Sequence, residues 1–226
     1  VLFAAAQDAT RPEISGIFIS LRGPELTLAA TDSYRLAEAR LRLEHAGRDV
    51  TAIIPARALS ELARILPADG SVSAYISDSQ ALFVVDGTEL TTRLIEGQYP
   101  DYQQIIPASS QTEATVEIEF LTKAVKTASL FCKPGINDVT VELDPAAKTI
   151  TCTAANAELG EHRGSIKAKV SGRTTSIVFN YRYLLDGLAN LGTDSATLGV
   201  TDSASPGVLR PQGGATYLYL LMPIRQ

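Results

Sequence analysis

Side chains that could carry out catalysis are few in this sequence and stand far apart. Asp32 lies in "ATDSY", two residues before Tyr34, and a hydrolase could use such a carboxylate as a general base. An aspartate directly after a strand more commonly caps a turn, however, and the matching place in a later, related stretch holds Asn156. Because no second carboxylate is matched to it, we predict a structural role for Asp32.

The two histidines and the two cysteines do not form a recognisable ligand set. His45 in "LEHAGRD" and His162 in "GEHRGS" have polar neighbours, which is typical of solvated turns, and a zinc or iron site would need further ligands nearby. Cys132 and Cys152 lack CxxC spacing, so we predict two reduced thiols, with Cys152 buried in a strand. There is also no GxSxG, P-loop, GxGxxG or HExxH motif, so we predict no catalytic residues, no metal and no cofactor.

The elements that position these residues occur twice along the chain. "ELTLAATDSYRLAEARL" (25–41) and "TITCTAANAELGEHRGS" (149–165) each indicate a strand, a polar turn and a second strand. A strand that runs directly into a helix follows in both copies, and a run of hairpin-like strands follows that. We therefore predict two domains of one fold, over residues 1–108 and 109–226.

The fold class that we predict is α+β, with two helices per domain packed on antiparallel sheet. The predicted helices cover residues 1–8, 55–66, about 119–131 and 180–191, with Pro55 at a first helical position. Apolar residues spaced along one face of each later helix predict buried stripes, among them Leu59, Leu62 and Leu66 of the helix 55–66. Basic residues recur on the opposite faces, where solvated helix surfaces are the plain alternative to a binding role.

Composition restricts the kind of protein. Hydrophobic residues make up 45% and charged residues 20%, as in a soluble globular protein, and no apolar run approaches the roughly 20 residues of a membrane helix. The start "VLFAAAQDATRPEIS" does not resemble a signal peptide and predicts a helix already under way. A net charge of −5 argues against a generic nucleic-acid binder, whose domains are usually basic.

Four motifs together resemble the bacterial sliding clamp, the beta subunit of the replicative DNA polymerase. They are "AATDSYRLA" (29–37), "LIEGQYPDYQQIIP" (94–107), "FNYRYLLDGL" (179–188) and "YLLMPIR" (219–225), in the order and at the spacing of that family. Family members have three repeated domains of the DNA clamp fold. This chain resembles the second and third domains over its whole length.

The resemblance implies a processivity factor without catalytic activity, located in the cytoplasm on the nucleoid. It implies a head-to-tail homodimer ring, in the full-length protein, whose helices surround double-stranded DNA without reading its sequence. A ring that is topologically linked to DNA needs only a mildly attractive bore, because tight phosphate binding would impede sliding, so an acidic chain is compatible with this role. The DNA-facing residues implied are Arg11, Arg57, Arg64, Lys123, Lys126 and Arg182.

The resemblance also implies a hydrophobic pocket for short apolar motifs from the replicative polymerase, the clamp loader and repair proteins. Pro100 would fix the backbone so that Ile105 faces the pocket, and Met222 would supply a deformable wall. Carried over position by position, the pocket residues are Ile14, Thr31, Ser33, Tyr34, Arg35, Leu36, Pro100, Gln104, Ile105, Asn180, Tyr183, Ala204, Leu220, Leu221, Met222, Pro223, Ile224 and Arg225. Ser33-Tyr34 replaces Gly-His of some relatives, and Gln104 replaces Arg, which puts the preferred peptide in question.

A further implication concerns "SLFCKPG" (129–135), which in the family meets the first domain of the other subunit. Leu130 and Phe131 would be the apolar contacts of this dimer interface. Since this chain lacks a first domain, we predict that it is a monomer or associates weakly. The alternative to a clamp is a two-domain β-rich adhesion or ligand-binding module. The repeat and the acidic charge are equally compatible with such a module, but it would not bind peptides from replication proteins.

Overall fold

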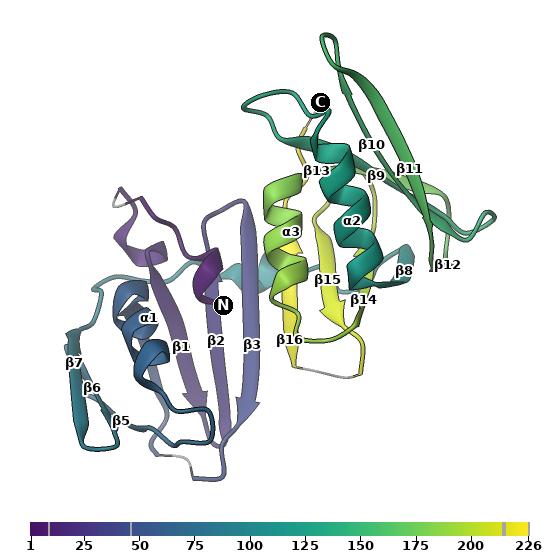
Figure 1. Cartoon of the computed structure of the whole chain (residues 1–226). Coiled ribbons are helices and arrows are strands. Elements are labelled where there is room, and N and C mark those ends of the chain that lie inside the picture. The colour runs from purple at the N-terminus through teal and green to yellow at the C-terminus, as the bar shows by residue number, and fades with distance from the viewer. Residues whose placement is uncertain (9, 46, 214–215, 226) are drawn as a thin grey trace. The chain divides into compact units, whose positions relative to one another are not determined.

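The computed structural model describes residues 1–8, 10–45, 47–213 and 216–225. The chain divides into two compact units, Val1–Asp101 and Tyr102–Gln226 (Figure 1). We predicted the division at residue 108, so residues 102–108 group with the second unit instead. The next residue, Ser109, is tied to the second unit, because its carbonyl accepts a hydrogen bond from the Thr201 hydroxyl at 3.2 Å.

The described residues of the first unit form two antiparallel sheets and one α-helix. Its larger sheet has the strand order β3 (Arg35–Arg42), β2 (Glu25–Thr31), β1 (Gly16–Arg22) and β4 (Val50–Pro55). Its smaller sheet has the order β5 (Ser73–Ile76), β6 (Gln80–Val85) and β7 (Thr88–Arg93). Helix α1 (Ala56–Ile65) follows β4 without a loop, and the 3-10 turn η2 (Pro12–Ile14) precedes β1.

Two predictions for the helices of the first unit are wrong. Residues 1–8 form only the 3-10 turn η1 (Leu2–Ala4), because Ala5 takes an extended conformation with φ −68° and ψ 145°. Pro55 is not the first helical residue but the residue before it, again with extended backbone. Of the predicted apolar stripe on α1 only Leu62 is buried, while Leu59 and Leu66 are partly exposed.

The second unit repeats this plan in a more complete form. One sheet has the order β11 (Gly160–Lys167), β10 (Thr149–Asn156), β9 (Asp138–Asp144) and β13 (Thr175–Asn180). The other has the order β12 (Lys169–Ser171), β8 (Thr112–Glu117), β14 (Ser195–Val200), β15 (Gly207–Pro211) and β16 (Tyr217–Leu221). The predicted strand pairs and strand-to-helix connections of both copies are thereby confirmed.

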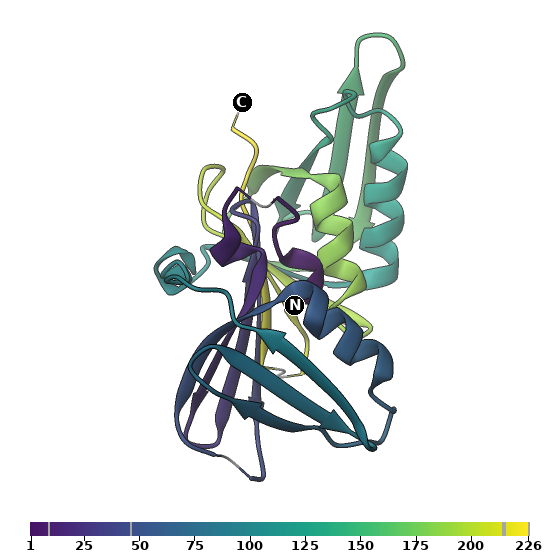
Figure 2. The same cartoon turned by 90° about the vertical axis from the view of Figure 1, so that its left-hand side faces the viewer.

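Helices α2 (Ile118–Ser129) and α3 (Tyr181–Ala189) lie side by side in the second unit (Figures 1 and 2). Their shared core includes Leu121 and Leu184, which are fully buried. Gly187 allows α3 to approach the sheet, because a Cβ atom there would lie 2.2 Å from the ring of Tyr219. A missing side chain on the helix therefore makes room for the largest fully buried side chain of the strand β16.

No helix in the described part of the chain has the length and apolarity to cross a membrane.

Candidate functional site

The "TDSY" turn of the first unit is held by its own side chains. The Asp32 carboxylate accepts hydrogen bonds from the backbone N–H groups of Tyr34 and Arg35, both at 3.0 Å, and from Arg35 Nε at 2.9 Å. Thr31 Oγ1 donates to the Arg35 carbonyl at 2.7 Å and accepts from Ser33 N at 3.1 Å. Asp32 therefore caps the turn, as predicted, and Ser33 takes the left-handed conformation with φ 78°.

This turn places one large side chain in solvent. Tyr34 is 63% exposed, whereas the predicted residues Leu36 and Ile14 are buried and do not present their side chains at the surface. The guanidinium of Arg11 donates to Ser33 Oγ at 2.9 Å and pairs with Glu13 at 3.2 Å. Arg11, predicted to face DNA, is therefore engaged by the turn that carries Tyr34.

In the second unit the segment after β16 lies along strand β13. The backbone N–H of Ile224 donates to the Val178 carbonyl at 2.8 Å, which fixes the course of residues 222–225. Leu220 and Leu221 are buried within β16, while Met222, Pro223 and Ile224 are partly exposed and Arg225 is exposed. The predicted C-terminal residues thus split into a buried support and an accessible apolar ridge. We call Met222–Arg225 the C-terminal ridge.

The start of helix α3 lies at the end of the same strand. Asn180 Oδ1 accepts a hydrogen bond from Arg182 N at 3.0 Å and so caps the helix. Tyr219 Oη donates to the Tyr183 carbonyl at 2.8 Å and ties the first turn of α3 to β16. The predicted pocket residues Asn180 and Tyr183 are therefore fixed against the two strands that carry the C-terminal ridge.

A short loop, 202–205, presents the predicted residue Ala204 in an exposed position. Asp202 Oδ1 accepts from Ala204 N at 2.9 Å and from Ser205 N at 2.6 Å, and these bonds hold the pKa of Asp202 below its usual range. In the connector, Gln104 and Ile105 of the 3-10 turn η3 (Tyr102–Ile105) are exposed, and Pro100 is partly exposed.

Two supporting residues of the second unit were not predicted. Asp202 could have been found, since "TDSA" (201–204) repeats the Thr/Ser-Asp-Ser pattern of "TDSY" (31–34) and "SDSQ" (77–80). Val178 could not, because it acts through its backbone carbonyl, which every residue type has.

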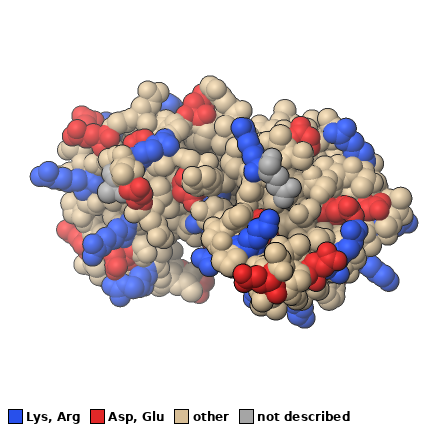
Figure 3. Space-filling model, turned by 90° about the horizontal axis from the view of Figure 1, so that it is seen from above, with Lys and Arg blue, Asp and Glu red and all other residues tan. Residues whose placement is uncertain are grey.

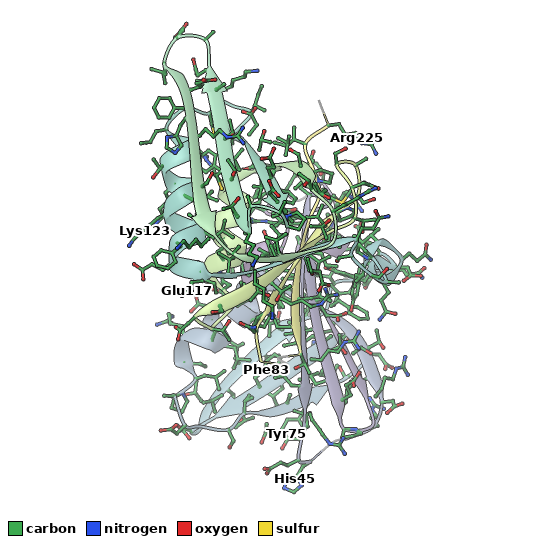
Figure 4. The ribbon with its side chains drawn as sticks, turned by 90° about the vertical axis from the view of Figure 1, so that its right-hand side faces the viewer. His45, Tyr75, Phe83, Glu117, Lys123 and Arg225 are labelled. Atoms are coloured by element: carbon green, nitrogen blue, oxygen red, sulfur yellow. The ribbon has the colours of Figure 1, made fainter. Side chains whose placement is uncertain are left out.

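The basic helix faces carry partly neutralised charge. Arg64 pairs with Glu61 at 2.9 Å, and Lys123 pairs with Glu119, on exposed surfaces where such pairs add little stability. Arg57 and Lys126 are exposed with no ion pair among the described residues. Figure 4 shows Lys123 pointing away from its helix, and Figure 3 shows positive and negative side chains interspersed over one face. These faces offer weak positive charge and no dense basic patch.

Helix α2 ends in an apolar corner. Leu130 is 69% exposed, and Phe131 stacks on His162 with ring centroids 5.8 Å apart. His162 lies within strand β11, so its predicted place in a solvated turn is wrong. The predicted interface residues thus include one freely accessible leucine and one aromatic ring that is partly covered within its own unit.

The titratable groups give little support to catalysis. Both cysteines are free and buried, and burial raises the pKa of the Cys132 thiol to about 11 and that of Cys152 to about 12. Neither thiol is therefore an activated nucleophile at neutral pH. Within the described ranges no three His, Cys, Asp or Glu side chains are grouped so as to hold a metal ion.

Comparison with known proteins gives consistent results for both units. Residues 1–101 match the family model of the DNA polymerase III beta subunit, central domain, and residues 103–225 match that of its C-terminal domain. The beta sliding clamp of Synechocystis sp. PCC 6803 is 33% identical over 239 residues, which cover 99% of this chain and 61% of that protein. The chain thus spans about three-fifths of the length of such relatives.

Solved structures agree with the family models. The DNA polymerase sliding clamp from Bacillus subtilis is 30% identical with a TM-score of 0.94, covering all of this chain and 60% of that one. A sliding clamp from Pseudomonas aeruginosa bound to griselimycin is 25% identical with a TM-score of 0.94, covering all of this chain and 61% of the other. The α+β clamp architecture predicted for the chain is confirmed.

Proposed function

Because the chain belongs to the family of the DNA polymerase III beta subunit, we propose that it supplies the second and third domains of a sliding clamp. In this role it is a non-catalytic processivity factor in the cytoplasm, associated with the nucleoid. It helps to encircle double-stranded DNA irrespective of sequence, and it tethers the replicative polymerase, the clamp loader and repair proteins through short apolar peptide motifs.

The observation that carries the peptide-binding part is the C-terminal ridge. A bond from Ile224 to Val178 holds the ridge in place, and Met222, Pro223 and Ile224 remain partly exposed beside it. The unbranched side chain of Met222 adapts to differently shaped apolar partners, which suits a surface used by several proteins. The sliding clamp bound to griselimycin supports ligand binding by a relative of similar architecture.

We propose that the "TDSY" turn contributes to the same activity through Tyr34. Its exposed ring offers a large, rigid contact area at a low entropic cost, and the bonds made by Asp32 orient it in advance. Ile105, which is 43% exposed, supplies a further apolar contact from the connector.

DNA contact is proposed for the outward basic residues of the three helices. The ion pairs of Arg64 and Lys123 leave Arg57, Lys126 and Arg182 as the stronger contributors. Leu130 and Phe131 are proposed to contact the first domain of another subunit, so this chain by itself is expected to sediment as a monomer or a weak associate.

Fluorescence polarisation with a labelled peptide carrying the motif Gln-Leu-x-Leu-Phe tests the proposal. We expect saturable micromolar binding, about −8 kcal/mol, and at least about a fivefold higher Kd for Tyr34→Ala and for Met222→Ala. Tyr75→Ala is the matched control, because Tyr75 is 62% exposed and Tyr34 is 63% exposed. A well-folded chain that does not bind the peptide at all would favour the adhesion-type module.

A further inference from the structure

The second unit contains a large open groove that shares no residue with the C-terminal ridge. Its volume is about 1160 Å³, enough for a drug-sized ligand or several peptide side chains. Its apolar lining includes Val116, Phe120, Ile166 and Val170, and Phe120 is 48% exposed although it is aromatic. We call this cavity the lysine groove, because three of its other lining residues are Lys148, Lys167 and Lys169.

The walls of the lysine groove are fixed by backbone hydrogen bonds. The N–H of Ala168 donates to the Lys148 carbonyl at 3.0 Å, which ties the β11–β12 connection to the turn between β9 and β10. The N–H of Ile118 donates to the Asp194 carbonyl at 2.8 Å, which holds the first turn of α2 next to the start of β14. Glu117, labelled in Figure 4, marks this start of the helix. The groove is thus preformed by secondary structure and not by loose loops.

The charge of the groove is not balanced internally. Lys148, Lys167 and Lys169 are all exposed, and Glu117 is the one carboxylate among the residues that line the groove. No ion pair joins any of these four side chains to another described residue. Lys123 on helix α2 differs, because Glu119 of the same helix neutralises it. An excess of positive charge therefore surrounds an apolar surface.

We propose that the lysine groove binds an acidic peptide segment of a partner protein, with an aromatic or leucine side chain flanked by carboxylates. The apolar anchor would pack on Phe120, Ile166 and Val170, and the carboxylates would approach the three lysines. DNA suits the groove less well, since its phosphate backbone has no apolar group to cover Phe120 and would meet Glu117.

Fluorescence anisotropy of a short labelled peptide, Asp-Glu-Leu-Phe-Glu-Asp, tests this with the whole chain at low salt. We expect saturable binding that weakens as salt is added. The double variant Lys167→Glu with Lys169→Glu, and separately Phe120→Ala, should each raise the Kd at least about tenfold. These side chains are exposed, so the variants should fold. Lys133→Glu, at an exposed lysine outside the groove, should leave the Kd unchanged.

The controls separate this site from the C-terminal ridge and from other occupants. Met222→Ala should not alter the binding of the acidic peptide, whatever its effect on the Gln-Leu-x-Leu-Phe peptide. Equal affinity for the uncharged peptide Asn-Gln-Leu-Phe-Gln-Asn, or no effect of the groove variants, would overturn the proposal. So would displacement of the peptide by a short DNA duplex at equal concentration, or self-association of the chain that only the groove variants abolish.

Discussion

In each unit the segment that follows the last strand forms a backbone hydrogen bond to the strand that precedes a helix, β4 in the first unit and β13 in the second. We call this place the corner of the unit, and the residues around it differ between the two units. In the first unit Ile95 N donates to the Ile53 carbonyl of β4 at 2.9 Å, and in the second Ile224 N donates to the Val178 carbonyl of β13 at 2.8 Å. The residue before Ile95 is Leu94, whose N–H donates to the Ser79 carbonyl at 2.8 Å. The residue before Ile224 is Pro223, which has no N–H to donate.

This difference makes the corner of the second unit the better candidate for a binding surface. In the first unit the returning segment is tied to the neighbouring turn and carries charged residues, Arg93 and Glu96, beside a cavity of about 480 Å³. In the second unit the corresponding positions hold Met222 and Arg225, and proline removes the donor for the equivalent tie. The repeated scaffold thus carries two charged residues, Arg93 and Glu96, at this corner in one copy, and one apolar and one charged residue, Met222 and Arg225, in the other.

The helices that follow these strands show a second exchange. Leu62 on α1 and Gly187 on α3 each stand seven residues after the residue that precedes the helix. Leu62 is the buried residue of α1, whereas at Gly187 the space belongs to the Tyr219 ring. The buried side chain at this position therefore comes from the helix in the first unit, as Leu62, and from strand β16 in the second, as Tyr219.

The largest expected effect is on the free energy of unfolding, when the side chain is made smaller at Leu62 and larger at Gly187. Leu62→Ala should lower the free energy of unfolding of the first unit by about 2–4 kcal/mol, through lost burial and a cavity. Gly187→Ala should lower that of the second unit by about 1–3 kcal/mol, because the added methyl meets the Tyr219 ring. Hydrogen exchange during urea titration would report each unit separately, with Ala189→Ser, an exposed change on α3, as the control. A neutral Gly187→Ala would show that the helix can move away from the sheet.

A smaller effect is expected from exchanging the proline. Leu94→Pro removes the bond to Ser79 and should destabilise the first unit by about 1 kcal/mol. Pro223→Ala restores a donor in the second unit and should weaken the binding of the Gln-Leu-x-Leu-Phe peptide by about threefold, as the ridge closes toward the 202–205 loop. Peptide titration and exchange of the new amide would check both statements. Tighter binding by Pro223→Ala would refute the proposed role of the missing donor.

The sequence was sufficient to predict the strands and helices whose patterns are local. β2–β3 and β10–β11 alternate with period two around a polar turn, and β4 and β13 lead directly into helices. Residues 1–8 were misjudged because an alanine-rich run favours a helix by propensity, whereas isolated short helices need tertiary contacts to form. β11 was misjudged at His162, because a strand with one open edge and few apolar residues resembles a turn in sequence.

Part of the candidate site could be proposed from the sequence for a similar reason. Exposed side chains such as Tyr34, Ile105 and Met222 belong to motifs that sequence alone reveals. The bond between Ile224 and Val178 joins backbone groups, and the fit of Gly187 to Tyr219 joins residues far apart in sequence. Neither depends on a residue pattern that can be recognised before the chain is folded.

Acid should distinguish the two turns next to these corners. In the second unit Asp202 caps the 202–205 loop, and its bonds to Ala204 and Ser205 hold its pKa below the ordinary value of 3.8. In the first unit the Ser77 hydroxyl accepts from Gln80 N at 3.1 Å and does not titrate.

A group with a lowered folded pKa stabilises above its unfolded pKa, and this stabilisation is lost as pH falls through the folded value. The amide signals of Ala204 and Ser205 should therefore shift below about pH 3.8 as their hydrogen bonds to Asp202 weaken, while the Gln80 amide keeps its hydrogen bond to Ser77. NMR titration measures both, and Asp202→Asn should remove the pH dependence. Loss of the Gln80 hydrogen bond over the same pH range would indicate general unfolding instead.

The smallest expected effect concerns two arginines at the same place in the repeat. Arg57 and Arg182 each stand two residues after the residue that precedes their helix, and both are exposed. If each contacts one phosphate, Arg57→Ala and Arg182→Ala should reduce the slope of log affinity for duplex DNA against log salt by about 0.9 each. Arg64→Ala should change it less, since Glu61 already neutralises that side chain. An equal slope change for Arg64 would mean that the ion pair breaks on DNA binding. No change for Arg57 or Arg182 would show that the recurrence of arginine reflects helix solvation and not contact with DNA.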